Sequence, residues 1–483
     1  MGAAVPFIGY APDADPTAAG VIVDCSALIP GRRGMVAAPA PVPVAGALAL
    51  PSDARGAAVA VDTAGNRRTI VGTQPRLWLL GAGGWSDVSR PGGYAGSAEG
   101  RWSFAQFGNA VVASNRVDGM QASVSGAFSD IAGAPRARVV IGAPNFVLAL
   151  ATSDATYGDQ PDRWWCSAFQ THTDWTPSVS TQCTTGRLIG GGGELTAGLM
   201  LGQQPVAYKA GSMFVGNYVG APVVWQWEQI PGDVGCVGPE AVCDIGGAHF
   251  FVGESDLWLF DGTRPVPVGR GAVRDWFFSA SSPVFRHRTM LLADRQHERV
   301  WIFFPSAAST TGACDMCLVY HVARQAWGRA DTVAQAVLNA VSPATSFDAA
   351  PATFDAAPAT FDSQLWAPGG RLPAIVGASR MLQTLSGAAG ASRLVTGDLG
   401  DDFGASFLRR VRLRFLTEPQ SASVQGLVRS GPGRPQLAGG TAVLNDAGFD
   451  IRQSGRWHRL AFDFSGPMEL DAIAIDTAAA GTR

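Results

Sequence analysis

Lysine is nearly absent from this sequence of 483 residues. Lys209 is its one lysine, so arginine supplies the rest of the 36 basic side chains. This scarcity excludes the lysine that grips phosphate in a P-loop and most lysine-based catalysis. Charged residues make up only 16% of the chain and the formal net charge is −3, which excludes a generally basic nucleic-acid-binding protein.

Cysteine and long hydrophobic runs are also scarce. The seven cysteines form an odd, sparse set that does not suit a disulfide framework. Residues 1–20 lack a basic segment followed by a sustained apolar core, so they do not have the pattern of a secretory signal. No window is long and apolar enough to span a membrane. We therefore expect no membrane-spanning segment and folding in a reducing cytoplasm.

Glycine and proline, in contrast, are abundant, with 60 and 31 copies, and hydrophobic residues make up 47% of the chain. This composition favours many short strands joined by turns over long helices. Residues 76–90 (RLWLLGAGGWSDVSR) align without gaps to residues 256–270 (DLWLFDGTRPVPVGR). Leu, Trp, Leu, Val and Arg recur in the two copies. The offset of 180 residues corresponds to about four blades of a four-stranded β-propeller.

Further hairpins with turn residues between apolar runs fill the interval, as at 101–115, 207–230, 248–262 and 295–306. No amphipathic helix of several turns interrupts them, which argues against a parallel βαβ fold. The sequence therefore predicts an all-β protein. We expect an N-terminal arm and first strands over 1–50, a propeller of about six blades over 51–395, and a small antiparallel sheet or sandwich over 396–483.

Two segments stand out from this pattern. Residues 343–362 repeat every seven residues and place Phe347, Phe354 and Phe361 beside Asp348, Asp355 and Asp362. The favoured interpretation is an extended loop inserted in the propeller, and an Asp-lined metal or partner site is the alternative. Near the C-terminus, Val411, Leu413 and Phe415 alternate with Arg410, Arg412 and Arg414, which predicts a strand with one buried face.

Candidate chemical groups are weak, and the sequence assigns no catalytic, cofactor-binding or metal-ligating residue. Cys314 and Cys317 have the spacing of a metal or redox pair, but no second pair exists to complete a zinc site. The six histidines are scattered singly. The acid pairs Asp154 with Asp159 and Glu254 with Asp256 invite a glycosidase hypothesis, which needs a carboxylate separation that sequence does not supply.

Two more groups have both a functional and a structural interpretation. A basic face of six arginines near the C-terminus could meet phosphate or an acidic partner, whereas a solvated strand face is the preferred interpretation. Trp164, Trp165 and Trp175 could stack on sugars, although half-buried tryptophans of blades are commoner. The arginines of this face are Arg409, Arg410, Arg412, Arg414, Arg456 and Arg459.

Several blocks resemble the tail hub or nozzle proteins of short-tailed bacteriophages, which are related to packaged-DNA stabilisation proteins. These blocks are IVDCSALIPGRRGMVAAP at 22–39, WSFAQFGNAVVASN at 102–115, the long hairpin block at 205–277 with its HFFVGESDLWLFDG and PVG motifs, and GRWHRLAFDFSG at 455–466.

The resemblance implies a β-propeller that assembles into a ring, commonly a hexamer, below the portal and adaptor proteins. Such a ring continues the DNA channel and carries tail fibres, spikes or a plug. It also implies a structural component of the virion, made in the host cytoplasm, without catalysis or cofactor. The alternative is a propeller that binds or degrades glycans.

Overall fold

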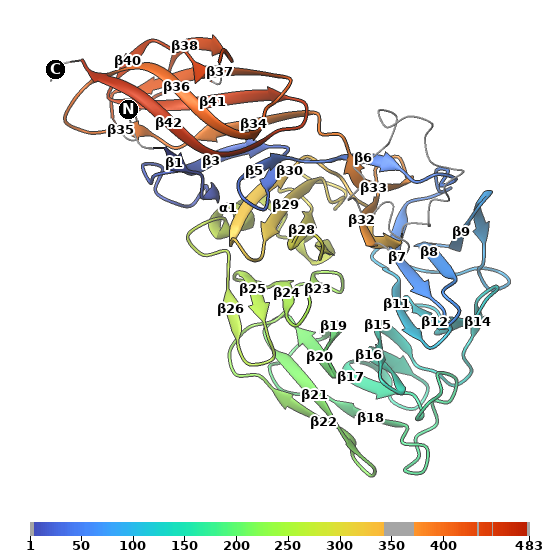
Figure 1. The fold of residues 1–483 in the computed structure, drawn as a ribbon. Coiled ribbons are helices and arrows are strands. Elements are labelled where there is room, and N and C mark those ends of the chain that lie inside the picture. The colour runs from blue at the N-terminus through green and yellow to red at the C-terminus, as the bar shows by residue number, and fades with distance from the viewer. Residues whose placement is uncertain (1–3, 342–370, 432–433, 447, 481–483) are drawn as a thin grey trace.

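The computed structural model describes residues 4–341, 371–431, 434–446 and 448–480 and is almost entirely β-structure. In these ranges the helices are α1 (Arg274–Ala280) and one turn of 3₁₀-helix (Arg286–Arg288). Neither helix is long and apolar enough to cross a bilayer. Figure 1 shows a ring of blades with a second, elongated β-structure beside it. The repeat at 343–362 lies outside the described residues.

The ring is a β-propeller whose blades are four-stranded antiparallel meanders. The described strands form six separate four-stranded sheets, and a seventh set of four strands belongs to a larger sheet. The first five blades are β7–β10 (Ala54–Val61, Arg67–Thr73, Leu77–Gly81, Gly84–Asp87), β11–β14 (Ser103–Phe107, Ala110–Ser114, Gln121–Ser123, Ser129–Asp130), β15–β18 (Arg136–Ala143, Phe146–Asp154, Gly158–Cys166, Thr184–Arg187), β19–β22 (Leu195–Leu201, Gln204–Lys209, Met213–Gly220, Val224–Gln229) and β23–β26 (Val242–Asp244, His249–Val252, Leu257–Phe260, Pro265–Pro267).

The last two blades close the ring. They are β27–β30 (Met290–Asp294, Arg299–Phe304, Met316–His321, Ala326–Ala330) and β31–β33 (Ala336–Val341, Arg371–Val376, Leu382–Gly387) with β6 (Ala40–Pro43). The outermost strand of the final blade thus comes from near the N-terminus, and β6 pairs antiparallel with β33. Each inner strand, the first of its blade, contacts the next, and β31 contacts β7. The all-β class and the propeller predicted from the sequence are confirmed.

The matched segments 76–90 and 256–270 occupy the same place in two blades, four blades apart. Each forms the outer hairpin, β9–β10 and β25–β26. The backbone contacts repeat as well: Val88 N donates to Leu77 O over 2.9 Å, and Val268 N donates to Leu257 O over 2.8 Å. Trp258 is half-buried and packs on the main hydrophobic core. The repeated residues therefore serve blade packing.

The second β-structure is a sandwich of two sheets, visible as the red and orange layers of Figure 1. One sheet has the order β4-β5-β42-β36-β39, with β1 on β42 and β40 on β36; the other has the order β2-β3-β34-β41-β37-β38, with β35 on β41. These strands are β1 (Val5–Pro6), β2 (Gly9–Tyr10), β3 (Val21–Ser26), β4 (Leu28–Pro30), β5 (Met35–Ala37), β34 (Ala391–Thr396), β35 (Leu399–Gly400), β36 (Ser406–Thr417), β37 (Ser421–Arg429), β38 (Leu437–Val443), β39 (Gly448–Phe449), β40 (Gln453–Gly455), β41 (Trp457–Ser465) and β42 (Glu469–Ala479).

Aromatic side chains join the two sheets. The Phe449 ring lies 5.3 Å from Phe462 on the opposite sheet, centroid to centroid. On β36, Val411 and Leu413 are buried while Arg412 and Arg414 are exposed, so the predicted alternation is confirmed. The sandwich combines residues from both ends of the chain, because β1 pairs with β42 and β3 with β34. The sequence did not predict this sharing of residues 1–37 with the C-terminal region.

One sheet runs through both parts of the molecule. β4 pairs with β30 at the outer edge of its blade, and β5 then connects β4 to β42, giving an 11-stranded sheet. The Arg299 guanidinium of the same blade donates through Nε to Pro30 O over 2.8 Å. Gly328 allows the close approach of β4, since a Cβ atom there would lie 2.5 Å from Leu28 O. The joint is therefore continuous hydrogen-bonded structure.

Gly328→Ala tests this joint. The added methyl group would collide with the backbone of β4, so we expect a loss of about 3 kcal/mol in the free energy of unfolding. Calorimetry is expected to show the sandwich melting apart from the propeller. Gly83→Ala is the matched control, because no atom lies within 4 Å of its Cβ position. Equal melting of both variants would contradict the role given to the joint.

Candidate functional site

A cavity of about 500 Å³ opens at the end of the propeller where the inner strands begin. Its walls come from the segments that lead into β11, β19, β23 and β27, from the first residues of β15 and β19, and from the turn between β12 and β13. Ring closure alone brings these segments together, because they are spread over some 190 residues. The lining residues are Ser97, Glu99, Gly100, Arg101, Asn115, Arg116, Val117, Arg138, Glu194, Thr196, Val237, Gly238, Pro239, Glu240, His287 and Arg288.

Three glutamates of the wall are each held by an arginine. Glu194 receives both ends of the Arg138 guanidinium, at 2.6 and 2.8 Å. Glu240 pairs with Arg101. These are charge-assisted contacts. In each of the three pairs the arginine comes from a blade other than that of the acid, so the pairs connect different blades of the ring.

Glu99 is the most strongly perturbed acid of the cavity. Arg288 contacts it at 2.5 and 3.0 Å, and His287 Nε2 lies 3.1 Å away. The hydrogen bonds from Arg288 lower its pKa to about 2; partial burial opposes this shift, and His287 adds to it. Glu99 is therefore ionised at neutral pH and is not suited to act as a general acid.

Arg116 differs from the other arginines of the wall. Its backbone has φ 65°, the left-handed conformation that residues other than glycine seldom adopt. Its Nη2 atom contacts Asp159 Oδ1 at 3.1 Å. Its Nη1 atom is buried, makes no hydrogen bond within the described chain and lies 3.8 Å from Glu194 Oε2. Arg116 is thus paired with Asp159 and, at ion-pair distance, with Glu194.

The turn between β12 and β13 holds Arg116 in this conformation. Asn115 Oδ1 accepts hydrogen bonds from the backbone N–H groups of Val117 and Asp118, at 3.1 and 2.8 Å. This is the side-chain-to-backbone pattern by which asparagine stabilises tight turns. Asn115 Nδ2 also donates to Asp118 Oδ2 over 3.0 Å.

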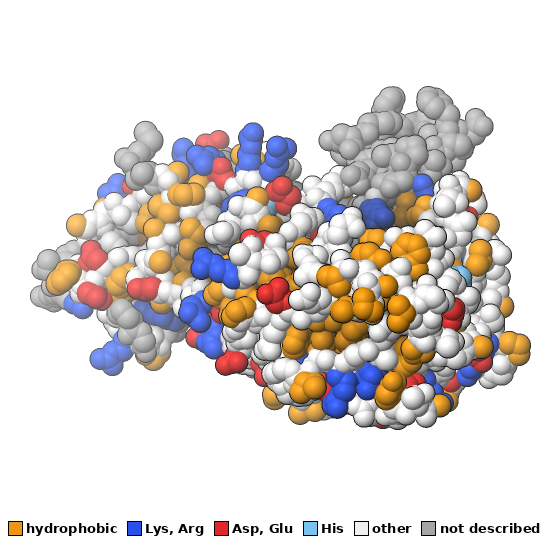
Figure 2. Space-filling view, turned by 90° about the horizontal axis from the view of Figure 1, so that it is seen from below, with side chains coloured by type: hydrophobic (Ala, Val, Ile, Leu, Met, Phe, Trp, Pro, Cys, Tyr) orange, Lys and Arg blue, Asp and Glu red, His pale blue; other side chains and the backbone are white. Residues whose placement is uncertain are grey.

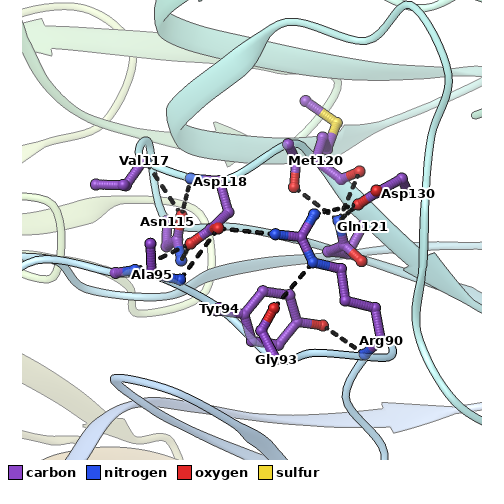
Figure 3. Close-up of polar contacts among 12 residues, drawn as sticks. Arg90, Gly93, Tyr94, Ala95, Asn115, Val117, Asp118, Met120, Gln121 and Asp130 are labelled. Atoms are coloured by element: carbon purple, nitrogen blue, oxygen red, sulfur yellow. Dashed lines mark hydrogen bonds and ion pairs between the residues drawn. The ribbon is translucent and has the colours of Figure 1, made fainter.

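A polar network anchors this turn from behind (Figure 3). Arg90 donates to Asp118 at 2.9 Å and to Asp130 at 2.7 Å, and its Nε donates to Gly93 O at 3.0 Å. The guanidinium also lies over the Tyr94 ring, 5.2 Å from its centroid. Arg90 follows β10 of the first blade, whereas both acids belong to the second. The network therefore ties the two blades together beside the cavity.

Asp118 links the turn to the segment that carries Glu99 and Arg101. It accepts hydrogen bonds from the N–H groups of Ala95 and Gly96 at 3.2 and 3.0 Å. Burial raises the energy of its charged form, but the hydrogen bonds from Asn115, Gly96 and Ala95 and the charge of Arg90 outweigh this effect and lower its pKa.

The residues that the sequence singled out lie away from this cavity or serve the fold. Cys314 and Cys317 are buried in the core of their blade, and burial raises the pKa of the Cys314 thiol to about 12. Among the described residues no group of three or more His, Cys, Asp or Glu could hold a metal ion. This environment favours packing as the role of the cysteine pair.

The acid pairs singled out from the sequence also form contacts within the fold. Asp256 is buried and accepts hydrogen bonds from the N–H groups of Leu257 and Gly269, at 2.8 and 3.1 Å. Its burial raises its pKa. Glu254 lies on an exposed turn. Asp154 Oδ1 accepts from the backbone of the β16–β17 turn, and Asp159 pairs with Arg116.

The tryptophans and the C-terminal arginines that the sequence singled out also have structural roles. Trp164, Trp165 and Trp175 are buried, which removes their faces from any sugar. Arg414 pairs with Asp471, and Arg459 pairs with the buried Asp398. The basic face is thus partly neutralised by neighbouring acids, as a structural strand face would be.

Comparison with known proteins identifies no family for this chain. No family model and no curated protein matches the chain. Similar solved structures include YCF48 bound to a D1 peptide (12% identity, TM-score 0.33, covering 59% of this chain and 83% of that one). A second is a catalytically inactive virginiamycin B lyase from Staphylococcus aureus (9% identity, TM-score 0.28, covering 53% of this chain and 94% of that one). A third is an exo-β-1,3-galactanase from Phanerochaete chrysosporium (9% identity, TM-score 0.27, covering 90% of this chain and 99% of that one).

Asp118→Asn tests the network behind the cavity. The change leaves the Arg90 charge less compensated, so we expect a loss of about 3 kcal/mol in the free energy of unfolding at pH 7. Because folding lowers the Asp118 pKa, this contribution is present above the ordinary carboxyl pKa of about 4 and vanishes as the pH falls through the lowered value.

The control is Asp159→Asn, which removes an exposed ion pair and should cost less than about 0.5 kcal/mol. Chemical denaturation of both variants between acid and neutral pH gives the comparison. A cost for Asp118→Asn that does not shrink on acidification would contradict the electrostatic origin of its effect.

Proposed function

We propose that the chain is a structural subunit of a bacteriophage tail, in the hub or nozzle ring below the portal and adaptor. The observation that carries the proposal is the 11-stranded sheet shared by propeller and sandwich. A continuous sheet fixes the orientation of the two parts, which suits a subunit that must keep its shape within a ring. The sequence resemblance adds support, since its longest block, 205–277, spans β20 to α1.

The surface of the propeller also suits assembly. Hydrophobic side chains gather on the underside of the propeller (Figure 2). Phe169, Tyr218, Val219 and Val223, on the loops and hairpin of the third and fourth blades, are exposed by 38% to 57%. A cluster of exposed apolar side chains is typical of surfaces that pack against another protein. We infer that neighbouring copies of the chain cover this surface.

The structure gives less support to the alternative of a glycan-binding or glycan-degrading propeller. The three tryptophans considered for sugar stacking are buried, and none of the described residues that line the cavity is Phe, Tyr or Trp. Sugar sites commonly use exposed aromatic faces. Binding or hydrolysis on a glycan panel, lost on changing one cavity carboxylate, would favour this alternative.

Ring formation tests the proposal. We expect the purified chain to form closed rings, with six copies as the expected number, when measured by mass photometry and electron microscopy. Val219→Asp should reduce the ring fraction about tenfold or more, because it places a charge in the apolar contact. Val443→Asp, at an exposed position on the sandwich edge, is the matched control.

Two outcomes would count against these proposals. A monomer at high concentration that is also absent from phage particles would overturn the tail-subunit proposal. Rings that form equally well in both valine variants would leave the tail subunit standing but place the contact elsewhere.

A further inference from the structure

We propose that Phe403 of the sandwich docks on the exposed apolar side chains of the propeller in the next copy of the chain. This contact rests on the ring of copies proposed above and names the second of its two surfaces. The first surface, called the propeller patch from here on, is formed by Phe169, Tyr218, Val219 and Val223. Phe403 is exposed by 88%, more than any other large hydrophobic side chain of the described residues.

A ring of more than two copies needs two different contact surfaces on each subunit. A patch that packs against its own counterpart gives a closed dimer, whereas a ring forms when one patch meets a different patch of the next copy. The propeller patch therefore needs a partner surface elsewhere on the same chain. Figure 1 shows β35, which precedes Phe403, and β22, which follows Val223, at opposite ends of the molecule. Surfaces placed in this way can join copies head to tail.

The turn that carries Phe403 is fixed to the sandwich. Asp401 Oδ1 accepts hydrogen bonds from the backbone N–H groups of Phe403 and Gly404, at 2.8 and 2.7 Å. Asp402 Oδ1 accepts one from Trp457 Nε1 of β41 at 3.1 Å. The phenylalanine side chain adds little to the fold of the single chain, because most of its surface faces solvent. A side chain on a fixed turn loses less conformational freedom when it docks, so this turn suits a contact between proteins.

The propeller patch presents two aromatic side chains that are also held in place. Phe169 and Tyr218 each lie 5.5 Å from the buried Phe146, measured between ring centroids. The Tyr218 hydroxyl donates to Gln182 Oε1 over 2.6 Å, so its polar atom already has a partner. Aromatic side chains favour edge-to-face and offset contacts with one another. The patch is therefore suited to receive a phenylalanine.

Two charge substitutions, studied alone and mixed, test the contact. Phe403→Asp and Val219→Asp should each reduce the ring fraction about tenfold or more, because each places a charge in an apolar contact. An equimolar mixture should form a heterodimer, since Phe403 of one variant meets the intact propeller patch of the other. The heterodimer should not grow, because both of its remaining surfaces carry a substitution. Sedimentation velocity at up to about 100 µM measures these species.

Val443→Asp is the matched control on the same sheet. Val443 is exposed by 71% and pairs through Ser423 with the Asp463 end of β41, whereas β35 pairs with the Trp457 end. This variant should form rings like the wild type. Asp401→Ala keeps the phenylalanine but releases its turn, so it should weaken assembly less than Phe403→Asp does.

The outcomes separate this contact from the tail-subunit proposal. Rings that form equally well in Phe403→Asp, or a mixture that stays monomeric, would overturn the contact and leave the tail subunit standing. Open chains of the wild type that both substitutions abolish would support the contact and count against a closed ring. A monomeric wild type would overturn the contact, whereas the tail-subunit proposal falls only if the chain is also absent from phage particles.

Discussion

The pairing of β6 with β33 is the contact on which the rest of the structure depends. A blade buries its faces only against its neighbours, so a propeller is stable when the last blade meets the first. Here the chain completes the last blade with a strand from its N-terminal region. Because β6 directly follows β5, closing the ring also fixes the N-terminal segment along the sandwich. The shared sheet through β30, β4 and β42 follows from the same connection.

Ring closure creates the cavity as well as the fold. All inner strands run in the same direction, so the segments that precede them meet at one end of the ring. Arg101 and Arg116 come from the second blade, Arg138 from the third and Arg288 from the segment that leads into the sixth, and the ring brings them to one cavity. Acids hold each of these arginines, and Asn115 fixes the turn that carries Arg116. The cavity thus depends on the ring topology, which brings its wall segments together, and on the left-handed backbone of Arg116 in one of its turns.

The sequence predicted what is local and missed what is long-range. The hairpins, the repeat of 76–90 at 256–270 and the alternation on β36 all depend on neighbouring residues, and the structure confirms them. The arginines of the cavity stand in loops without any pattern, and the pairing of β1 with β42 joins opposite ends of the chain. The two copies of the repeat differ in their polar contacts. Arg90 pairs with the buried Asp118 and the exposed Asp130, whereas its counterpart Arg270 is 75% exposed. Copies of one blade hairpin have therefore kept the same packing and gained different polar contacts.

The functional proposal rests on shape. A propeller and a sandwich joined by continuous β-sheet present several surfaces at fixed angles, which is what a ring subunit between two other assemblies requires. The most direct test is to place an epitope tag in the exposed β9–β10 turn beside Gly83 and to locate it by immuno-electron microscopy on particles released from cells that express the native operon. The account predicts labelling at the tail, below the portal. Labelling of cell material alone, with unlabelled particles, would contradict it.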